Sequence, residues 1–186
     1  PAMSQLASHI EHDALSMYNT VGPSVGTPGT TPTTLQPYSQ ARAKLKTQAT
    51  PKDNLRCTQI NSESSAAVIN GLKGLFQDST QISKQYLEGM LGRASGYDFY
   101  ENDLLKTHTT GEFDGTVVID GTTGLTEGST AIQADGFTSA APTLTVGDVF
   151  TIAGLYDIHP ETRQALPHLK QFVVTTAVTG AGNEID

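Results

Sequence analysis

The chain has 186 residues, of which 37% are hydrophobic and only 16% are charged, and its formal net charge is −8. An acidic chain repels the phosphates of nucleic acids and anionic lipids, so the composition argues against binding either of them. With Cys57 as the only cysteine, no disulfide can form within the chain, and a reducing compartment fits best. No apolar run reaches the roughly 18 residues that a membrane-spanning helix requires.

The first predicted element is an amphipathic helix over residues 3–21, ended by Gly22-Pro23. Its apolar residues recur every three or four positions and therefore share one face. They are Met3, Leu6, Ile10, Ala14, Met17 and Val21. A Gly- and Pro-rich loop follows over residues 22–34.

Three further helices are expected before residue 92. The second helix spans 35–49, because Thr33 or Thr34 can cap it and Pro37 suits its first turn. A short strand over 55–60 precedes a third helix, which Ser62 can cap. The third helix spans 63–76, a short fourth helix spans 82–91, and an alternating strand runs from Tyr97 to Phe99.

The pattern changes near Thr107, beyond which helical periodicity gives way to short β-rich runs. These runs cover 116–119, 131–133, 149–152 and 171–178. Four turn-forming pairs punctuate this part of the sequence: Asp114-Gly115, Asp120-Gly121, Asp135-Gly136 and Gly147-Asp148. We expect Phe150 and Phe172 to pack across a strand pair in the core of this part. The chain therefore divides into an α/β part, 1–106, and an all-β part, 107–186.

One motif suggests catalysis. Residues 22–26 match the G-x-S-x-G pattern of serine hydrolases, in which a strand precedes the serine and a helix follows it. Here a predicted helix precedes Ser24 and a loop follows it, so the context is wrong. Asp157, His159 and His168 are candidate triad partners, and a small serine hydrolase remains an alternative hypothesis.

Other polar groups carry weaker signals. His9, His12 and Asp13 share a helix surface and could hold a metal, but no fourth ligand is obvious, and a solvated polar face explains them as well. Cys57 has the pattern of a half-buried strand residue. A cationic stretch, formed by Arg42, Lys44, Lys46 and Lys52, reads as a solvated helix face. We predict no enzymatic activity and no catalytic, cofactor-binding or metal site.

Three stretches in collinear order carry a family resemblance. The longest, residues 147–175, begins GDVFTIAGLY and continues through HPETRQ to LKQFVVT. Upstream are 67–76 followed by Lys84-Gln85-Tyr86, and 92–100 followed by His108-Thr109. Together they resemble the major capsid (coat) proteins of tailed double-stranded-DNA bacteriophages, in the branch with an inserted accessory β-domain.

The resemblance implies an α+β chain with a partial Hong-Kong-phage type capsid fold. Residues 1–21 would end the spine helix of the peripheral domain, 22–106 would form part of the α/β axial domain, and 107–186 would be an inserted all-β, barrel-like domain. The family's N-terminal arm and extended loop have no counterpart here, so we expect a fragment of a longer coat protein.

The implied function is structural: in full-length form the protein self-assembles into the icosahedral head around the genome. Its partners would be other copies of itself, with scaffolding and portal proteins as further candidates. It would bind no specific nucleic acid and no membrane. It would be found in the virion, and in the host cytoplasm before assembly. A β-rich adhesin or receptor-binding module is the other alternative, favoured by Thr- and Gly-rich hairpins but not by the amphipathic helices.

The last prediction concerns residues 120–142, which contain Asp120, Glu127 and Asp135 but no Lys or Arg. A long acidic excursion has little to bury and should project from the β-part. In the family, a projecting loop at this position touches a neighbouring subunit across a local two-fold axis. We therefore predict that these three carboxylates make an inter-subunit contact, with an unpartnered surface loop as the alternative.

Overall fold

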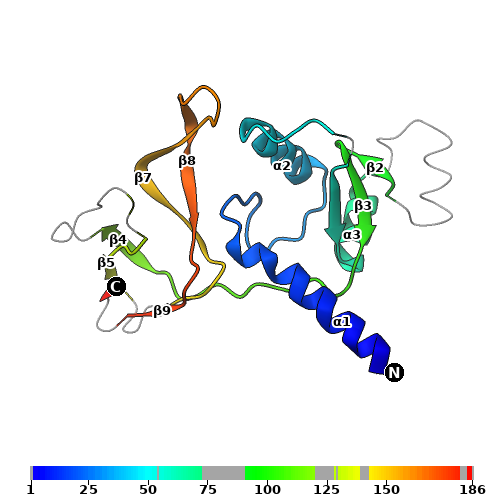
Figure 1. Ribbon diagram of the computed structural model, residues 1–186, viewed down its shortest axis with the longest axis horizontal. Coiled ribbons are helices and arrows are strands. Elements are labelled where there is room, and N and C mark those ends of the chain that lie inside the picture. Colours follow the sequence, from blue (N-terminus) through cyan, green and yellow to red (C-terminus); the bar gives the residue numbers. More distant parts are fainter. Residues whose placement is uncertain are drawn as a thin grey trace. The chain divides into compact units, whose positions relative to one another are not determined.

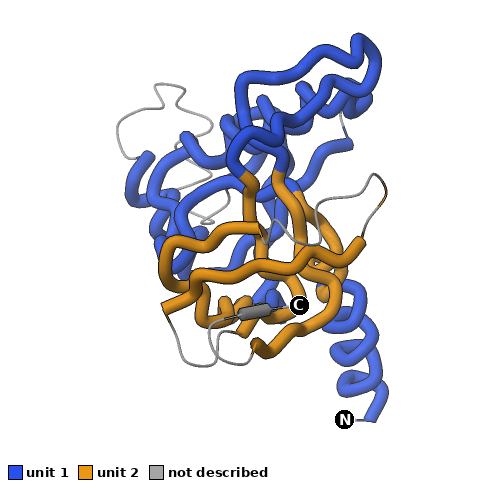
Figure 2. The backbone as a smooth tube through the Cα atoms, turned by 90° about the vertical axis from the view of Figure 1, so that its left-hand side faces the viewer, with its two compact units in different colours: residues 1–15, 23–106, 153–170 blue, residues 16–22, 107–152, 171–186 orange. Residues whose placement is uncertain are grey.

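The computed structural model describes residues 2–53, 55–72, 91–119, 128, 130–138, 143–180 and 184–185. The chain is a mixed α+β protein that divides into two compact units (Figures 1 and 2). Unit 1 comprises residues 1–15, 23–106 and 153–170, and unit 2 comprises residues 16–22, 107–152 and 171–186. Unit 1 therefore includes a segment, 153–170, that comes from the part of the sequence expected to be all-β.

The N-terminal α-helix is shorter than the helix over residues 3–21 that the apolar spacing predicts. Helix α1 (Ala2–Leu15) is followed by a 3-10 helix, η1 (Ser16–Thr20), in place of one continuous helix to residue 21. The Thr20 hydroxyl donates to the Met17 carbonyl at 2.9 Å, which caps this tighter segment. No residue of α1 is buried, and the predicted apolar face is largely open: Met3 is 78% exposed and Ile10 is 63% exposed.

Helices α2 (Gln36–Thr47) and α3 (Ser62–Gly71) belong to unit 1. Pro37 lies in the first turn of α2, and the Thr34 hydroxyl accepts a hydrogen bond from the Gln36 amide at 3.4 Å. The N-cap of α3 is Asn61, whose Oδ1 accepts from the Ser64 amide at 3.0 Å, and not Ser62 as predicted. Residues 73–76 of the predicted third helix, and most of the predicted helix at 82–91, lie outside the described residues.

A small sheet and α3 enclose the core of unit 1. The strand order is β1 (Cys57–Ile60), β3 (Tyr97–Glu101), β2 (Arg93–Ala94), with β1 parallel to β3 and β2 antiparallel to it. The fully buried Val68 is the centre of the core. Its neighbours are Leu72 and Leu91, with Leu35, Tyr38, Ile69 and Phe99 packed around them.

Unit 2 contains two small antiparallel sheets. Strand β5 (Ala134–Phe137) lies between β4 (Gly115–Ile119) and β10 (Glu184–Ile185), while β6 (Thr143–Leu144) pairs with β9 (Val178–Thr179). Phe137 is buried with its ring edge-on to Phe113 at 5.3 Å. The described strands do not close into a barrel, so the expected barrel is not seen in this part of the chain.

A long hairpin, β7 (Val149–Ile158) and β8 (Ala165–Val173), joins the two units covalently. Its base belongs to unit 2, and its tip half, residues 153–170, belongs to unit 1. The predicted pairing of Phe150 with Phe172 is confirmed, because the two rings stack at 5.7 Å. Both rings are only half-buried, however, so they are not the fully enclosed core that the sequence suggested.

Candidate functional site

The tip half of the hairpin is held to α2 by Asp157, a carboxylate that is only 5% exposed. Its Oδ1 accepts hydrogen bonds from Lys170 Nζ at 3.2 Å and from the Ile158 amide at 3.0 Å. Its Oδ2 accepts from Gln48 Nε2, and His168 Nε2 lies 3.5 Å from the same oxygen. Gln48 is the C-cap residue of α2, so this one carboxylate fastens a strand to a helix end.

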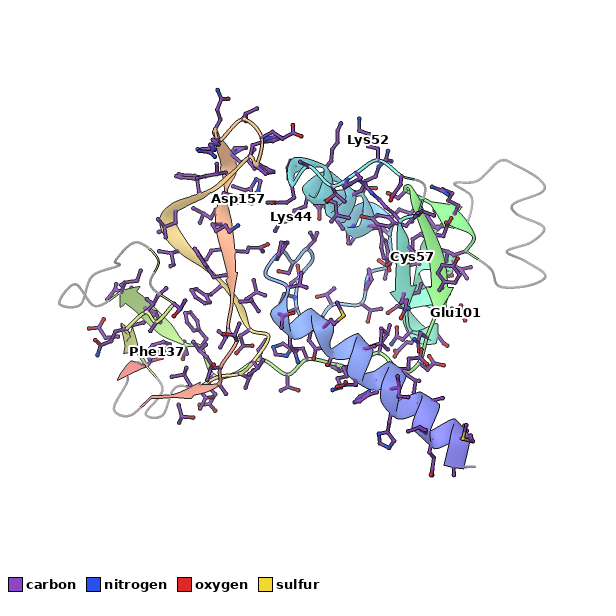
Figure 3. The ribbon with its side chains drawn as sticks, viewed as in Figure 1. Lys44, Lys52, Cys57, Glu101, Phe137 and Asp157 are labelled. Atoms are coloured by element: carbon purple, nitrogen blue, oxygen red, sulfur yellow. The ribbon has the colours of Figure 1, made fainter. Side chains whose placement is uncertain are left out.

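The electrostatics of Asp157 follow from these partners. Burial raises its pKa, but the hydrogen bond and charge of Lys170, with the Ile158 amide and Gln48, outweigh burial and hold the pKa below its usual range. Lys44, on α2, faces the same carboxylate (Figure 3). Burial lowers the pKa of Lys44 more than the attraction of Asp157 raises it, and Lys44 Nζ also donates to the Ser24 carbonyl at 3.1 Å.

A second buried carboxylate, Asp148, organises unit 2. It accepts hydrogen bonds from the Thr145 amide at 2.7 Å, from the Thr145 hydroxyl at 3.1 Å and from the Gly111 amide at 3.1 Å. His108 Nε2 lies 2.7 Å from its Oδ1. Burial raises the pKa of Asp148, but these hydrogen bonds lower it further, so the carboxylate stays charged. It thereby ties the segment after residue 107 to the turn before β7.

Backbone hydrogen bonds around Asp148 add to those of its side chain. The Val174 amide donates to the Asp148 carbonyl, and the Gly147 amide donates to the Val174 carbonyl, both at 2.9 Å. Gly147 has a φ of +98°, and a Cβ there would lie 2.7 Å from Asn19 Oδ1. Only glycine fits this turn without strain.

Charge is divided very unevenly between the two units. All 11 Lys and Arg residues of the sequence lie in unit 1, where 11 carboxylates balance them. The remaining eight carboxylates lie in unit 2 and give it the entire net charge of −8. They are Glu112, Asp114, Asp120, Glu127, Asp135, Asp148, Glu184 and Asp186.

Of the three carboxylates predicted to contact a neighbouring subunit, only Asp135 lies among the described residues. Asp120 and Glu127 lie outside the described residues. Asp135 lies within β5, opposite Val118 of β4 and Glu184 of β10, so this part of the predicted projecting excursion is a paired strand and not a loop. Its Oδ1 is buried without a hydrogen-bond partner among the described residues. The inter-subunit contact itself stays a prediction.

The candidate hydrolase residues do not adopt the expected elbow. Within the continuous described stretch 2–53, η1 ends at Thr20, α2 begins at Gln36, and Ser24 lies in the loop between them. His168 lies beside Asp157. His159 is at the hairpin tip, where its Nδ1 accepts from the amides of Glu161 and Thr162 at 3.2 and 3.3 Å.

The other residues singled out by sequence lie on the surface. His9, His12 and Asp13 are on the exposed surface of α1, and among the described residues no group of three or more His, Cys, Asp or Glu side chains is arranged to hold a metal ion. Cys57 is on β1 but exposed, and not half-buried as predicted. No helix among the described segments is long and apolar enough to span a membrane.

No model of a protein family matches the chain, and no curated protein matches it.

Proposed function

We propose that this chain is part of the major capsid protein of a tailed double-stranded-DNA bacteriophage. In full-length form that protein self-assembles into the icosahedral head that encloses the genome. The observation that carries the proposal, beside the collinear resemblance of residues 67–175, is the open apolar face of α1. A helix with one apolar face normally buries it, so an exposed face calls for a partner surface.

The way α1 attaches to unit 1 supports this argument. Glu11 Oε1 accepts a hydrogen bond from Asn102 Nδ2 at 2.7 Å, and Ser8 and Leu15 are partly covered. Met3, Leu6 and Ile10 remain exposed. The helix thus lies on the unit through polar contacts and leaves its apolar stripe available. In a coat subunit this would be the spine helix of the peripheral domain, covered by the rest of that domain.

The remaining segments take their roles from the same proposal. Residues 22–106, with the β1-β3-β2 sheet and α2 and α3, would be part of the axial domain, and residues 107–186 would be the inserted β-domain. The concentration of negative charge in unit 2 suits a shell protein that must not grip packaged DNA, because like charges repel. The protein would act in the virion after folding in the host cytoplasm.

Electron microscopy of the complete coat polypeptide tests the proposal. The polypeptide should be expressed both alone and together with the other head proteins of its genome, because some coat proteins need a scaffold. Closed icosahedral shells are expected in at least one of the two preparations. Soluble monomers or irregular aggregates in both would refute the capsid function.

The predicted carboxylate contact has its own test. Replacing Asp120, Glu127 and Asp135 together with Ser in the complete polypeptide should give unstable or aberrant shells if the contact depends on their charge. Asp135→Ser alone is the necessary control, because Asp135 lies in a paired strand and its loss can affect folding. Normal shells with normal salt tolerance would leave only an unpartnered acidic surface.

A further inference from the structure

The tip half of the β7–β8 hairpin has one face that is bound and one that is open. On the face that meets α2, Asp157 contacts His168 and Lys170 of β8 and Gln48 of α2. Side chains alternate between the faces of a strand, so Tyr156 and Ile158 on β7 point the other way. On β8, Ala165 and Pro167 share this second face, because they alternate with His168 and Lys170.

These four residues form an exposed apolar surface, which we call the outer tip patch. Tyr156 is 53% exposed and Ile158 is 55% exposed, and Ala165 and Pro167 are exposed as well. Tyrosine is enriched among the residues that dominate binding energy in protein interfaces. The anchoring of the opposite face through Asp157 prevents the hairpin from rotating to bury this patch.

The edges of the hairpin are poorly suited to pairing with another strand. Pro167 lacks an N–H group and so removes a donor from β8. Gly154 has a φ of +85°, which interrupts the regular geometry of β7. A partner must therefore pack on the face of the hairpin.

The turn of the hairpin is rigid, which lowers the entropic cost of binding. The Arg163 amide donates to the His159 carbonyl at 2.8 Å, and the His159 amide donates to the Gln164 carbonyl at 3.0 Å. His159 Nδ1 also accepts hydrogen bonds from two backbone amides of the turn. This network holds the backbone of the turn that carries Glu161 and Arg163.

Charge indicates which partner fits. Glu161 and Arg163 are exposed and of opposite sign, and neither side chain has a hydrogen-bond or ion-pair partner among the described residues. The tip half as a whole carries two acidic and two basic residues, so it is neutral, whereas unit 2 carries the full net charge. Two copies of the chain therefore repel each other at unit 2 and meet without repulsion at the hairpin tip.

We propose that the outer tip patch packs face to face on the same patch of a second copy, about a two-fold axis parallel to the strands. Such an axis places β7 of one copy over β8 of the other, so Tyr156 lies on the partner copy's Pro167 and Glu161 opposes its Arg163. Each contact occurs twice, as in any isologous interface. This inference rests on the proposed coat function, because it names the surface through which subunits would meet.

Sedimentation velocity of the 186-residue chain over a concentration series tests the contact, in a Cys57→Ser background that prevents disulfide artefacts. Tyr156→Ser should weaken self-association by about tenfold or more. Tyr100→Ser is the matched control, since Tyr100 is 58% exposed in the same unit, and it should change nothing. Glu161→Arg should weaken association by about fivefold, and adding Arg163→Glu should restore it.

Salt dependence separates this contact from the carboxylate contact. Raising salt from about 0.1 M to about 1 M shortens the screening length from about 10 Å to about 3 Å. Salt screens both the Glu161–Arg163 pairs and the repulsion between acidic units, so the apolar part of the tip contact should persist at about 1 M salt, whereas an acidic loop on a basic patch should be lost. A chain that stays monomeric, equal effects of Tyr156→Ser and Tyr100→Ser, or complete loss of association at about 1 M salt would each overturn the proposal.

The two proposals fail separately. If the complete polypeptide forms normal shells with Tyr156→Ser, the coat function stands and the tip contact is wrong. If the complete wild-type polypeptide forms no shells, the coat function is wrong, and sedimentation of the 186-residue chain still decides whether the tip patch self-associates.

Discussion

Replacing Asp157 with Asn removes one buried charge and nearly preserves shape. Hydrogen bonds to charged groups contribute about 1.5–3 kcal/mol each. The Lys170 and His168 side chains are both more than one-third exposed, so water can partly replace the lost carboxylate. An Asn oxygen in the place of Oδ1 can still accept from the Ile158 amide, but the Asn NH2 group then takes the place of Oδ2, so Gln48 must turn its own amide oxygen toward it. We therefore expect Asp157→Asn to lower the free energy of unfolding by about 2 kcal/mol, which is less than the roughly 3–5 kcal/mol lost when a fully buried pair is broken.

Urea unfolding followed by circular dichroism measures this loss, and unit 1 supplies a matched control. Asp98 is 3.5 Å from Arg93 in an exposed pair, so Asp98→Asn should cost less than about 1 kcal/mol. Equal losses in the two variants would refute the view that Asp157 fastens the hairpin.

The pH dependence gives the same reasoning a second test. The folded state lowers the pKa of Asp157, so its stabilising effect is fully present above the unfolded pKa of about 3.9 and is lost as the pH falls through the lower folded value. The stability gap between the wild type and Asp157→Asn should therefore be constant near neutral pH and narrow below about pH 4. A gap that widens on acidification would contradict this assignment.

Three further substitutions probe packing and backbone. Phe150→Ala should lower stability by about 2 kcal/mol in thermal denaturation, which is roughly half the cost at a fully buried site, because the ring is half-buried. An unchanged melting temperature would show that the Phe150 ring contributes no packing energy. Val68→Ala should lower the free energy of unfolding in urea by about 2–3 kcal/mol, since two buried methyl groups are lost and a cavity remains. Val118→Ala is the control at an exposed site and should change it by less than about 0.5 kcal/mol. Similar losses in the two variants would refute the core assignment. Gly147→Ala should lower the free energy of unfolding in urea by about 1–3 kcal/mol, because the φ of Gly147 is positive and the new Cβ would press on Asn19. Wild-type stability of this variant would mean that the turn can change its backbone conformation without cost.

Local patterns predicted several elements well. The second helix was expected at 35–49 and spans Gln36–Thr47, and the strand at 55–60 contains β1 (Cys57–Ile60). Pro37 and the apolar spacing carry enough local information for this. The cap of α3 was misassigned because Asn61 and Ser62 are both good caps, and the Ser62 amide and hydroxyl instead bind Asp103, far along the sequence.

Long-range features escaped the sequence analysis. Periodicity identified the apolar face of α1 but not whether anything covers it, since that depends on tertiary packing. Asp148 was read only as a turn residue, and Asp157 only as a candidate triad member. Both carry a usable signal: Thr145 precedes Asp148 by three residues, and Asp157 interrupts an otherwise uncharged strand. A charged residue within such a strand must find partners, but the sequence does not say that these are Gln48 and Lys170.

The absence of Lys and Arg from the sequence of unit 2 gives it an unusual response to acid. Most domains become strongly cationic below pH 3, and the mutual repulsion of those cations helps to unfold them. In strong acid the carboxylates of unit 2 are protonated and uncharged, and His108 is then its single basic side chain. Its charge therefore falls from −8 almost to zero and never turns strongly positive. Acid would abolish the repulsion that keeps copies of this unit apart in solution, so low pH should favour its precipitation over its expansion.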